Sequence, residues 1–229
     1  LNNAAKEWSL DPKAEMWRLP SAFVGEYAEK DAEITLKLYH ALQHEITKQD
    51  LWDVFNLETN LFPCLVDMKF KGVRVDIEKA QAVKEQLVVT EKELLRDIKK
   101  LVGFDVEIWA GASIAKAFDK MKLPYDMTEK GSPSFTKNFL ATHPAELPKL
   151  ISSAREVNKA NTTFIDTILR HEHKGRIHAE INQIRSDQGG TVTGRFSYNS
   201  PNLQQIPARH KELGPMIRSL FIPEKGHKW

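Results

Sequence analysis

Two long amphipathic stretches constrain the fold of this chain more than any other feature. Apolar residues recur every three or four positions from residue 77 to 101, and again from about residue 147 to 171. This period places apolar side chains on one face of an α-helix, which must then pack against another element. Asp76 is a typical N-cap for the first helix, and Gly72 is a typical stop for a further helix over residues 56–72. The expected inward positions are Ile77, Ala80, Val83, Leu87, Leu94, Ile98 and Leu101 in the first helix, and Leu150, Ala154, Val157, Phe164 and Ile168 in the second.

The rest of the chain predicts one more long helix and a region of short elements. Residues 21–46 have helical periodicity, with apolar residues at Ala28, Ile34, Leu38, Ala41 and Ile46. Residues 110–150 are interrupted by prolines and a glycine, which is typical of loops and short helices.

A change of period near residue 176 predicts a small β portion. Ile177, Ala179 and Ile181 alternate with polar residues over residues 176–182, as in a half-buried strand. The pair Gly189–Gly190 can turn the chain, so that residues 191–193 return as the second strand of a hairpin. The expected fold is therefore mainly α with a small antiparallel β portion.

Composition narrows the class of protein. The chain of 229 residues is 41% hydrophobic and 28% charged, which fits a globular protein with a sizeable core. Cys64 is the only cysteine, so no intrachain disulfide forms and a reducing compartment fits best. No apolar run approaches the roughly 20 residues of a membrane span, and the first residues do not resemble a signal peptide. Because the chain begins at Leu1, we expect a fragment or a processed product.

Positive charge gathers towards the carboxyl end. The formal net charge is only +2, but residues 193–229 carry six Lys and Arg against two Asp and Glu. Within this part, residues 191–210 (TVTGRFSYNSPNLQQIPARH) contain no acidic residue. Amide and cationic donors without carboxylates suit the minor-groove acceptors and phosphates of a nucleic-acid duplex. On composition alone, a polar, proline-bounded surface loop is an equally good interpretation.

A polar row follows one face of the helix predicted over residues 147–171. Its members, at helical spacing, are Arg155, Lys159, Thr162, Asp166 and Arg170. The row fits contact with a phosphate backbone, but it also fits a solvated face with ion pairs along the helix, and Asp166 favours the second interpretation. The nearby His171, His173 and His178 lack the ordered ligand spacing of a zinc site, so we expect no metal there.

The end of the chain resembles a known family. TGR at residues 193–195, PNLQ-x-IP at 201–207, Arg209 and the run I-R-x-x-F-x-P at 217–223 resemble, in order and spacing, the segment before the first catalytic motif of family A DNA polymerases. Between Arg195 and Pro201, the residues Phe196, Tyr198 and Ser200 differ from the commoner sequence of the family. The likeness extends over nearly the whole chain and has the character of a phage enzyme. It implies the C-terminal remnant of a 3′–5′ exonuclease domain over residues 1–50, a thumb of long helices over 51–175, and the first part of an incomplete α+β palm over 176–229.

The resemblance also implies roles for individual residues. It places Arg195 in the minor groove near the primer terminus, with Asn202 and Gln204 at nearby sugar or base edges. It assigns Arg155 and Lys159 to duplex phosphates, which reverses the preference for a solvated face. The full set of DNA-binding residues that it implies is Arg155, Lys159, Thr193, Arg195, Asn202, Gln204, Arg209 and Arg218.

A second, shorter motif lies in the N-terminal region. Tyr27-x-x-x-Asp31 resembles the third motif of the proofreading exonuclease, in which carboxylates hold two metal ions and the Tyr orients the attacking water. Asp31 is a metal ligand in that chemistry only together with upstream carboxylates that this chain lacks. We therefore expect no DNA cleavage by this chain.

The resemblance implies a polymerase that uses Mg²⁺ held by two palm aspartates, both beyond Trp229. We therefore expect no cofactor and no polymerase activity in this chain alone, primer–template DNA as its partner, and a second chain or segment that supplies the fingers and palm. Its place would be the cytoplasm of a bacterial or phage-infected cell. The alternatives are a stand-alone duplex-binding module, an accessory or split subunit, and a helical structural protein.

Overall fold

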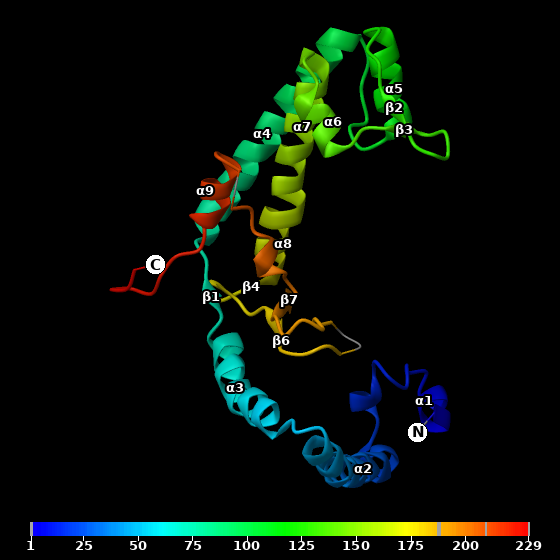
Figure 1. Cartoon of the computed structure of the whole chain (residues 1–229), viewed down its shortest axis with the longest axis vertical. Coiled ribbons are helices and arrows are strands. Elements are labelled where there is room, and N and C mark those ends of the chain that lie inside the picture. Colours follow the sequence, from blue (N-terminus) through cyan, green and yellow to red (C-terminus); the bar gives the residue numbers. More distant parts are fainter. Residues whose placement is uncertain (1, 187–188, 209, 229) are drawn as a thin grey trace. The chain divides into compact units, whose positions relative to one another are not determined.

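The computed structural model describes residues 2–186, 189–208 and 210–228 (Figure 1). These residues divide into two compact units, with the division between Pro63 and Cys64. The fold is mainly α with short antiparallel strands, as the sequence predicts. None of the helices in the described ranges is long and apolar enough to cross a membrane.

The first unit contains the helix predicted over residues 21–46. It consists of α1 (Asn2–Glu7), the 3₁₀ turn η1 (Met16–Arg18), α2 (Ser21–Lys48) and the start of α3 (Trp52–Lys71). Ala4, Ala5 and Leu19 form a small core, but α2, described over its whole length, buries none of its residues. Val24 near the start of α2 packs against this core, while apolar positions further along the helix are exposed, with Ile34 at 50% and Leu38 at 55%.

Helix α3 crosses the division between the units. Pro63 lies within it, where it removes one backbone N–H and crowds the carbonyl one turn earlier. The helix ends at Lys71, and Gly72 follows with φ of +65°, which confirms the predicted stop.

The second unit is built on two long helices that lie side by side (Figure 1). Helix α4 (Ile77–Val102) begins at the predicted N-cap, where an oxygen of Asp76 accepts the Lys79 N–H at 3.0 Å. Helix α7 (Glu146–Lys159) returns along α4 and continues through a π-helical turn, η2 (Ala160–Ile165), into α8 (Asp166–His171). The predicted helix over residues 147–171 is therefore present, with a π turn that its periodicity does not reveal.

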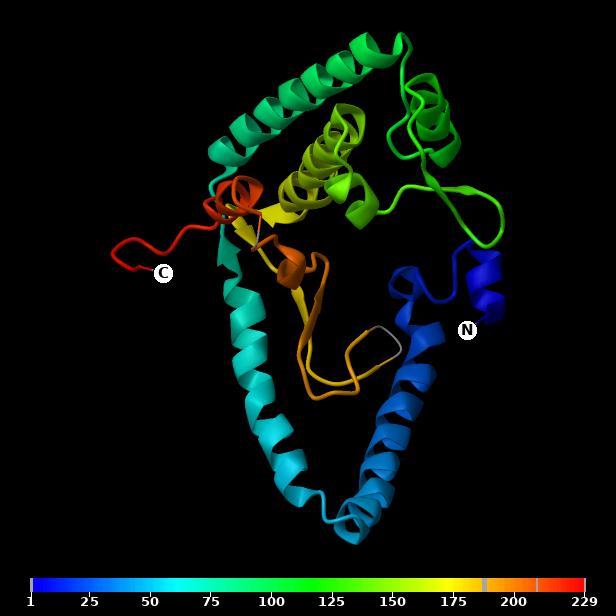
Figure 2. The same ribbon diagram turned by 45° about the horizontal axis from the view of Figure 1, so that its top comes forward.

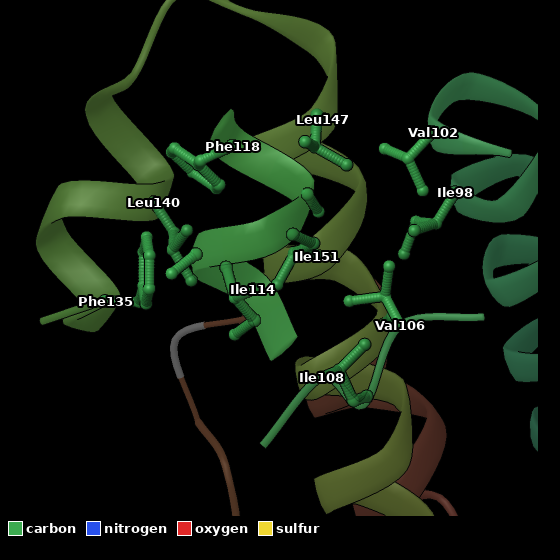
Figure 3. Packing of buried hydrophobic residues seen from close by; sticks show 13 residues of the cluster. Ile98, Val102, Val106, Ile108, Ile114, Phe118, Phe135, Leu140, Leu147 and Ile151 are labelled. Atoms are coloured by element: carbon green, nitrogen blue, oxygen red, sulfur yellow. The ribbon is translucent and has the colours of Figure 1, made fainter. Parts of the chain in front are cut away.

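The segment between α4 and α7 packs on their ends as a first core cluster. It contains α5 (Gly111–Lys120), the hairpin β2 (Asp126–Met127) and β3 (Pro133–Ser134), and α6 (Lys137–Thr142). Figure 3 shows how the apolar side chains of α4, α5, α6 and α7 converge. Phe118 is fully buried there, with its ring centroid 4.8 Å from that of Phe135.

A second core cluster lies where the two long helices meet the end of the chain. A three-stranded antiparallel sheet has the order β1 (Val73–Arg74), β5 (Arg176–Ile177), β4 (Glu172–His173). Helix α9 (Leu213–Arg218) lies beside the start of α4, as Figure 2 shows in red. The Asp76 N–H donates to Leu220 O at 2.9 Å, which joins the two segments.

The strand predicted over residues 176–182 is divided in the structure. Its first part is β5 and its last part is β6 (Glu180–Asn182), which belongs to a different sheet. Between them Ile177 and Ala179 are buried on either side of the less buried His178, whose Nδ1 lies 2.9 Å from Lys69 O.

The predicted hairpin partner over residues 191–193 is wrong. The strand that pairs with β6 is β7 (Ser197–Asn199), because Thr191 instead closes a local turn in which its hydroxyl donates to Arg195 O at 2.7 Å. The chain does turn at the predicted glycines, since Ser186 and Gly189 exchange backbone hydrogen bonds.

Candidate nucleic-acid interface

Lys159 is the last residue of α7, and its side chain is exposed. It borders a cavity of about 440 Å³ between α6, the α7–η2 junction and the segment that leads into α9. The walls are mixed and include both apolar and charged side chains. They are formed by Lys137, Glu156, Lys159, Ala160, Phe164, Gln205, Ile206, Pro207, Ala208, His210 and Leu213.

Arg155 lies one turn earlier on α7 and is half-buried. Its Nε donates to Ile108 O at 2.6 Å and its Nη1 donates to Phe135 O at 2.8 Å. The guanidinium carbon also lies 5.1 Å from the centroid of the Trp109 ring, in a cation–π contact. This one side chain therefore joins α7 to both ends of the segment between the long helices.

Two further hydrogen bonds connect Trp109, the ring under Arg155, to helix α4. The Trp109 indole N–H donates to Asn158 at 3.0 Å, and the Asn158 amide donates to Glu91 of α4 at 2.9 Å. Burial lowers the pKa of Arg155 below its ordinary value, but a guanidinium stays charged at any physiological pH. Two of its donors are already engaged, and its predicted contact with DNA phosphate stays a prediction.

The rest of the polar row is used in different ways. The Asp166 carboxylate pairs with Lys84 of α4 at 2.7 Å, so the acidic member of the row faces a partner on the neighbouring helix. The Thr162 hydroxyl donates to Asn158 O at 2.9 Å, and Arg170 is exposed.

The acid-free segment begins with a turn that presents Arg195. Thr193 donates to the Thr191 hydroxyl at 3.3 Å, and Thr191 in turn donates to Arg195 O. The Thr191 hydroxyl therefore holds the backbone of this turn, while the side chains of Thr193 and Arg195 are exposed.

Asn202 and Gln204 lie in and beside the 3₁₀ turn η3 (Leu203–Gln205). The Asn202 side-chain oxygen caps this turn by accepting the Gln204 N–H at 3.1 Å, and the Gln204 amide donates to Phe196 O at 3.0 Å. Both residues are exposed. The oxygen of Asn202 is engaged in this cap, and its amide N–H₂ is the donor group of this exposed side chain.

The remaining predicted DNA-binding residues are Arg209 and Arg218. Arg218 is exposed in the last turn of α9. Arg209 lies outside the described residues.

The predicted exonuclease pair lies on α2. Tyr27 and Asp31 face each other one turn apart, and the hydrogen bond to Asp31 raises the pKa of the Tyr27 hydroxyl. In the described ranges no three His, Cys, Asp or Glu side chains gather as a metal site would require, at Asp31 or near His171 and His178.

Residues 77–229 match the model of DNA polymerase family A. The chain belongs to this family. The matched range begins at α4, contains the first core cluster, nearly all of the second and the whole acid-free segment, and includes all eight DNA-binding residues that the resemblance implies.

The family A relatives include phage and bacterial enzymes. A DNA-directed DNA polymerase of Pseudomonas phage M6 is 35% identical over all of this chain, and a DNA polymerase I of Thermus filiformis is 32% identical over 88% of it. The chain spans 36% of the length of the phage protein and 25% of the Thermus one. A solved structure, the POL domain of Pol1 from M. smegmatis in complex with DNA primer-template and dNTP, covers 84% of this chain with a TM-score of 0.70 at 22% identity, and the match covers 34% of that structure. This likeness shows that the chain has the fold of the matched part of that polymerase domain.

Sequence reasoning missed a group of residues at the cavity beside Lys159. Glu156 lies 3.2 Å from Lys137 and also 3.2 Å from His210. Of these, only Glu156 carried a signal in the sequence, because it precedes Lys159 by three positions on one helix. Its partners lie on other elements, and no local pattern points to them.

Proposed function

We propose that this family A chain is the primer–template duplex-binding part of a template-directed DNA polymerase. The observation that carries the proposal is the exposed Arg195 in a segment without carboxylates, which also bears the TGR and PNLQ-x-IP motifs. Minor-groove acceptors occur at similar places on every base pair, so donors aimed at them recognise paired geometry without reading sequence.

The proposed contacts with DNA are of two kinds, to phosphates and to the minor groove. Lys159 and, with its remaining donors, Arg155 bind phosphates and position the duplex, while Arg195 and the amide of Asn202 contact the minor groove. In domain terms, residues 51–175 form the thumb, residues 176–229 begin the palm, and residues 1–50 are an exonuclease remnant.

Nucleotidyl transfer in such an enzyme uses two Mg²⁺ ions, which activate the primer hydroxyl and stabilise the leaving phosphate. We propose that the ligands of these ions lie in the segment or chain that supplies the palm; in the described ranges no three His, Cys, Asp or Glu side chains gather as a metal site would require. Its own part is to hold and orient the duplex. The complete polymerase would work in the cytoplasm of a bacterial or phage-infected cell, with fingers and palm supplied by another segment or chain.

The proposal is tested by measuring primer–template affinity against salt concentration. Each neutralised phosphate contributes roughly 0.9 to the slope of the log–log plot. We expect Lys159→Ala to lower this slope by about one contact, because one cation is lost. Lys48→Ala, an exposed lysine outside the family match, is the matched control and should leave the slope unchanged.

Arg195→Ala separates the two kinds of contact. It should lower affinity roughly tenfold while the salt slope stays at the wild-type value, since a lost groove contact releases no counterion. A wild-type chain without salt-dependent binding would refute the proposal, and a lower slope for Arg195→Ala would reassign this residue to a phosphate.

A further inference from the structure

Three elements of the second unit meet at the carboxylate of Glu156. Its Oε1 lies 3.2 Å from Lys137 Nζ of α6, and its Oε2 lies 3.2 Å from His210 Nε2, just before α9. The side chains of Glu156 and His210 are each about one-third exposed, so water only partly screens the contact.

The hydrogen bonds of His210 define where its ring proton lies. Its Nδ1 accepts the backbone N–H of Leu213 at 3.0 Å and that of Glu212 at 3.3 Å. Nδ1 therefore carries no proton, and Nε2 carries the proton that it donates to Glu156. One imidazole thus caps the start of α9 and reaches across to α7.

This imidazole holds one end of the segment that carries the amides of Asn202 and Gln204, called the amide segment below. The described part of the segment before His210 runs from Asn202 to Ala208, and it is held near its other end by the bond from Gln204 to Phe196 O. Between the two ends, Leu203 and Ile206 pack against the second core cluster. His210 ties this segment to α7 by a side-chain hydrogen bond to Glu156, which lies one turn from Lys159.

The negative charge of Glu156 is unfavourable beside a site that is proposed to bind phosphates. A carboxylate one helical turn from Lys159 repels the phosphates that Lys159 is proposed to bind, and so weakens duplex binding. We propose that Glu156 and His210 are positioning residues, which hold the amide segment and Lys159 in the one geometry that lets both contact the same duplex. This inference rests on the proposed function.

The decisive comparison is between Glu156→Ala and Glu156→Gln. Both variants remove the charge and the ion pair with Lys137, but only Gln keeps an oxygen that accepts the His210 Nε2–H. We expect Glu156→Ala to bind primer–template DNA three- to tenfold more weakly than wild type, the range set by one hydrogen bond. Glu156→Gln should bind more tightly than wild type, because it keeps the bond and loses the repulsion.

A second variant tests the other side of the contact. His210→Asn keeps a side chain that caps α9 but is too short to reach Glu156. It should lose affinity as Glu156→Ala does, with the wild-type salt slope, because the lost contacts are to groove atoms and not to phosphates. The double variant Glu156→Ala/His210→Asn should lose no more than either single variant.

The outcomes separate the inference from the proposed function. If wild type shows no salt-dependent binding, the proposed function fails. If wild type binds but Glu156→Ala and Glu156→Gln change affinity equally, or the losses of the two single variants add, the inference is overturned. Thermal unfolding of each variant identifies any variant that fails to fold. If a Glu156 variant fails to fold, the comparison of His210→Asn with wild type tests the inference.

Discussion

At the scale of single residues, Arg155 stabilises the fold, a role that its place in a row of polar residues does not indicate. Its guanidinium donates to Ile108 O and Phe135 O and lies over the ring of Trp109. A phosphate contact by the same group would use the donors that remain. The two parts are separable, because one depends on the fork geometry of arginine and the other on its charge.

Arg155→Lys should therefore lose stability but keep its salt dependence. An ammonium group cannot donate to both carbonyls with the same geometry, so we expect the free energy of unfolding to fall by about 1–3 kcal/mol in urea titrations. The slope of DNA affinity against salt should stay at the wild-type value, because the charge is retained. Lys159→Ala is the matched control and should show the reverse. A variant Arg155→Lys as stable as wild type would mean that the two carbonyl contacts contribute little.

At the scale of elements, the ends of the long helices depend on backbone conformations that side chains rarely adopt. Gly72 follows α3 at φ +65° and Gly103 follows α4 at φ +84°. Their surroundings differ. A Cβ at Gly103 would meet no described atom within 4 Å, whereas a Cβ at Gly72 would lie 2.8 Å from both the His178 ring and Ile177 O.

Alanine at the two positions should have unequal effects. Gly103→Ala should lower the free energy of unfolding by about 1–2 kcal/mol, which is the cost of the left-handed conformation alone. Gly72→Ala should cost more, because the backbone carbonyl of Ile177 cannot move aside without disturbing the pairing of β1 with β5. Equilibrium denaturation of both variants measures the difference. Equal losses of unfolding free energy in the two variants would show that the backbone at Ile177 shifts to accept the Cβ at little cost.

At the scale of the whole molecule, the second unit has two core clusters that share the helices α4 and α7. Phe118 is central to the first cluster and Ile217 to the second, and both are fully buried. Leu94 of α4 packs against both clusters. This arrangement favours separate local opening of the two cores.

Hydrogen exchange should resolve the two cores. Phe118→Ala removes a large buried side chain, with a cost of about 3–5 kcal/mol, and should speed amide exchange in α5 and α6. Amides of β5 and α9 should keep their protection, and Ile217→Ala should give the opposite pattern. Uniform acceleration across the unit by either variant would indicate a single cooperative core.

The long helices, two of their end residues and the family could all be predicted from the amino-acid sequence alone. Asp76 caps α4 and Gly72 follows α3 as predicted, because capping and helical periodicity act over a few neighbouring residues. The motif over residues 193–223 is equally local, and the family match confirms what it implied about ancestry.

Which side chains from distant parts of the chain come into contact depends on the tertiary structure. Arg155 finds Ile108 and Phe135 at separations of 47 and 20 residues, and Glu156 finds His210 at 54. The pairing of β6 with β7, in place of residues 191–193, also followed from a turn that no alternation shows. Contacts of this kind depend on how whole helices pack, and the spacing of residues along one element carries no information about the side chains that another element brings to it.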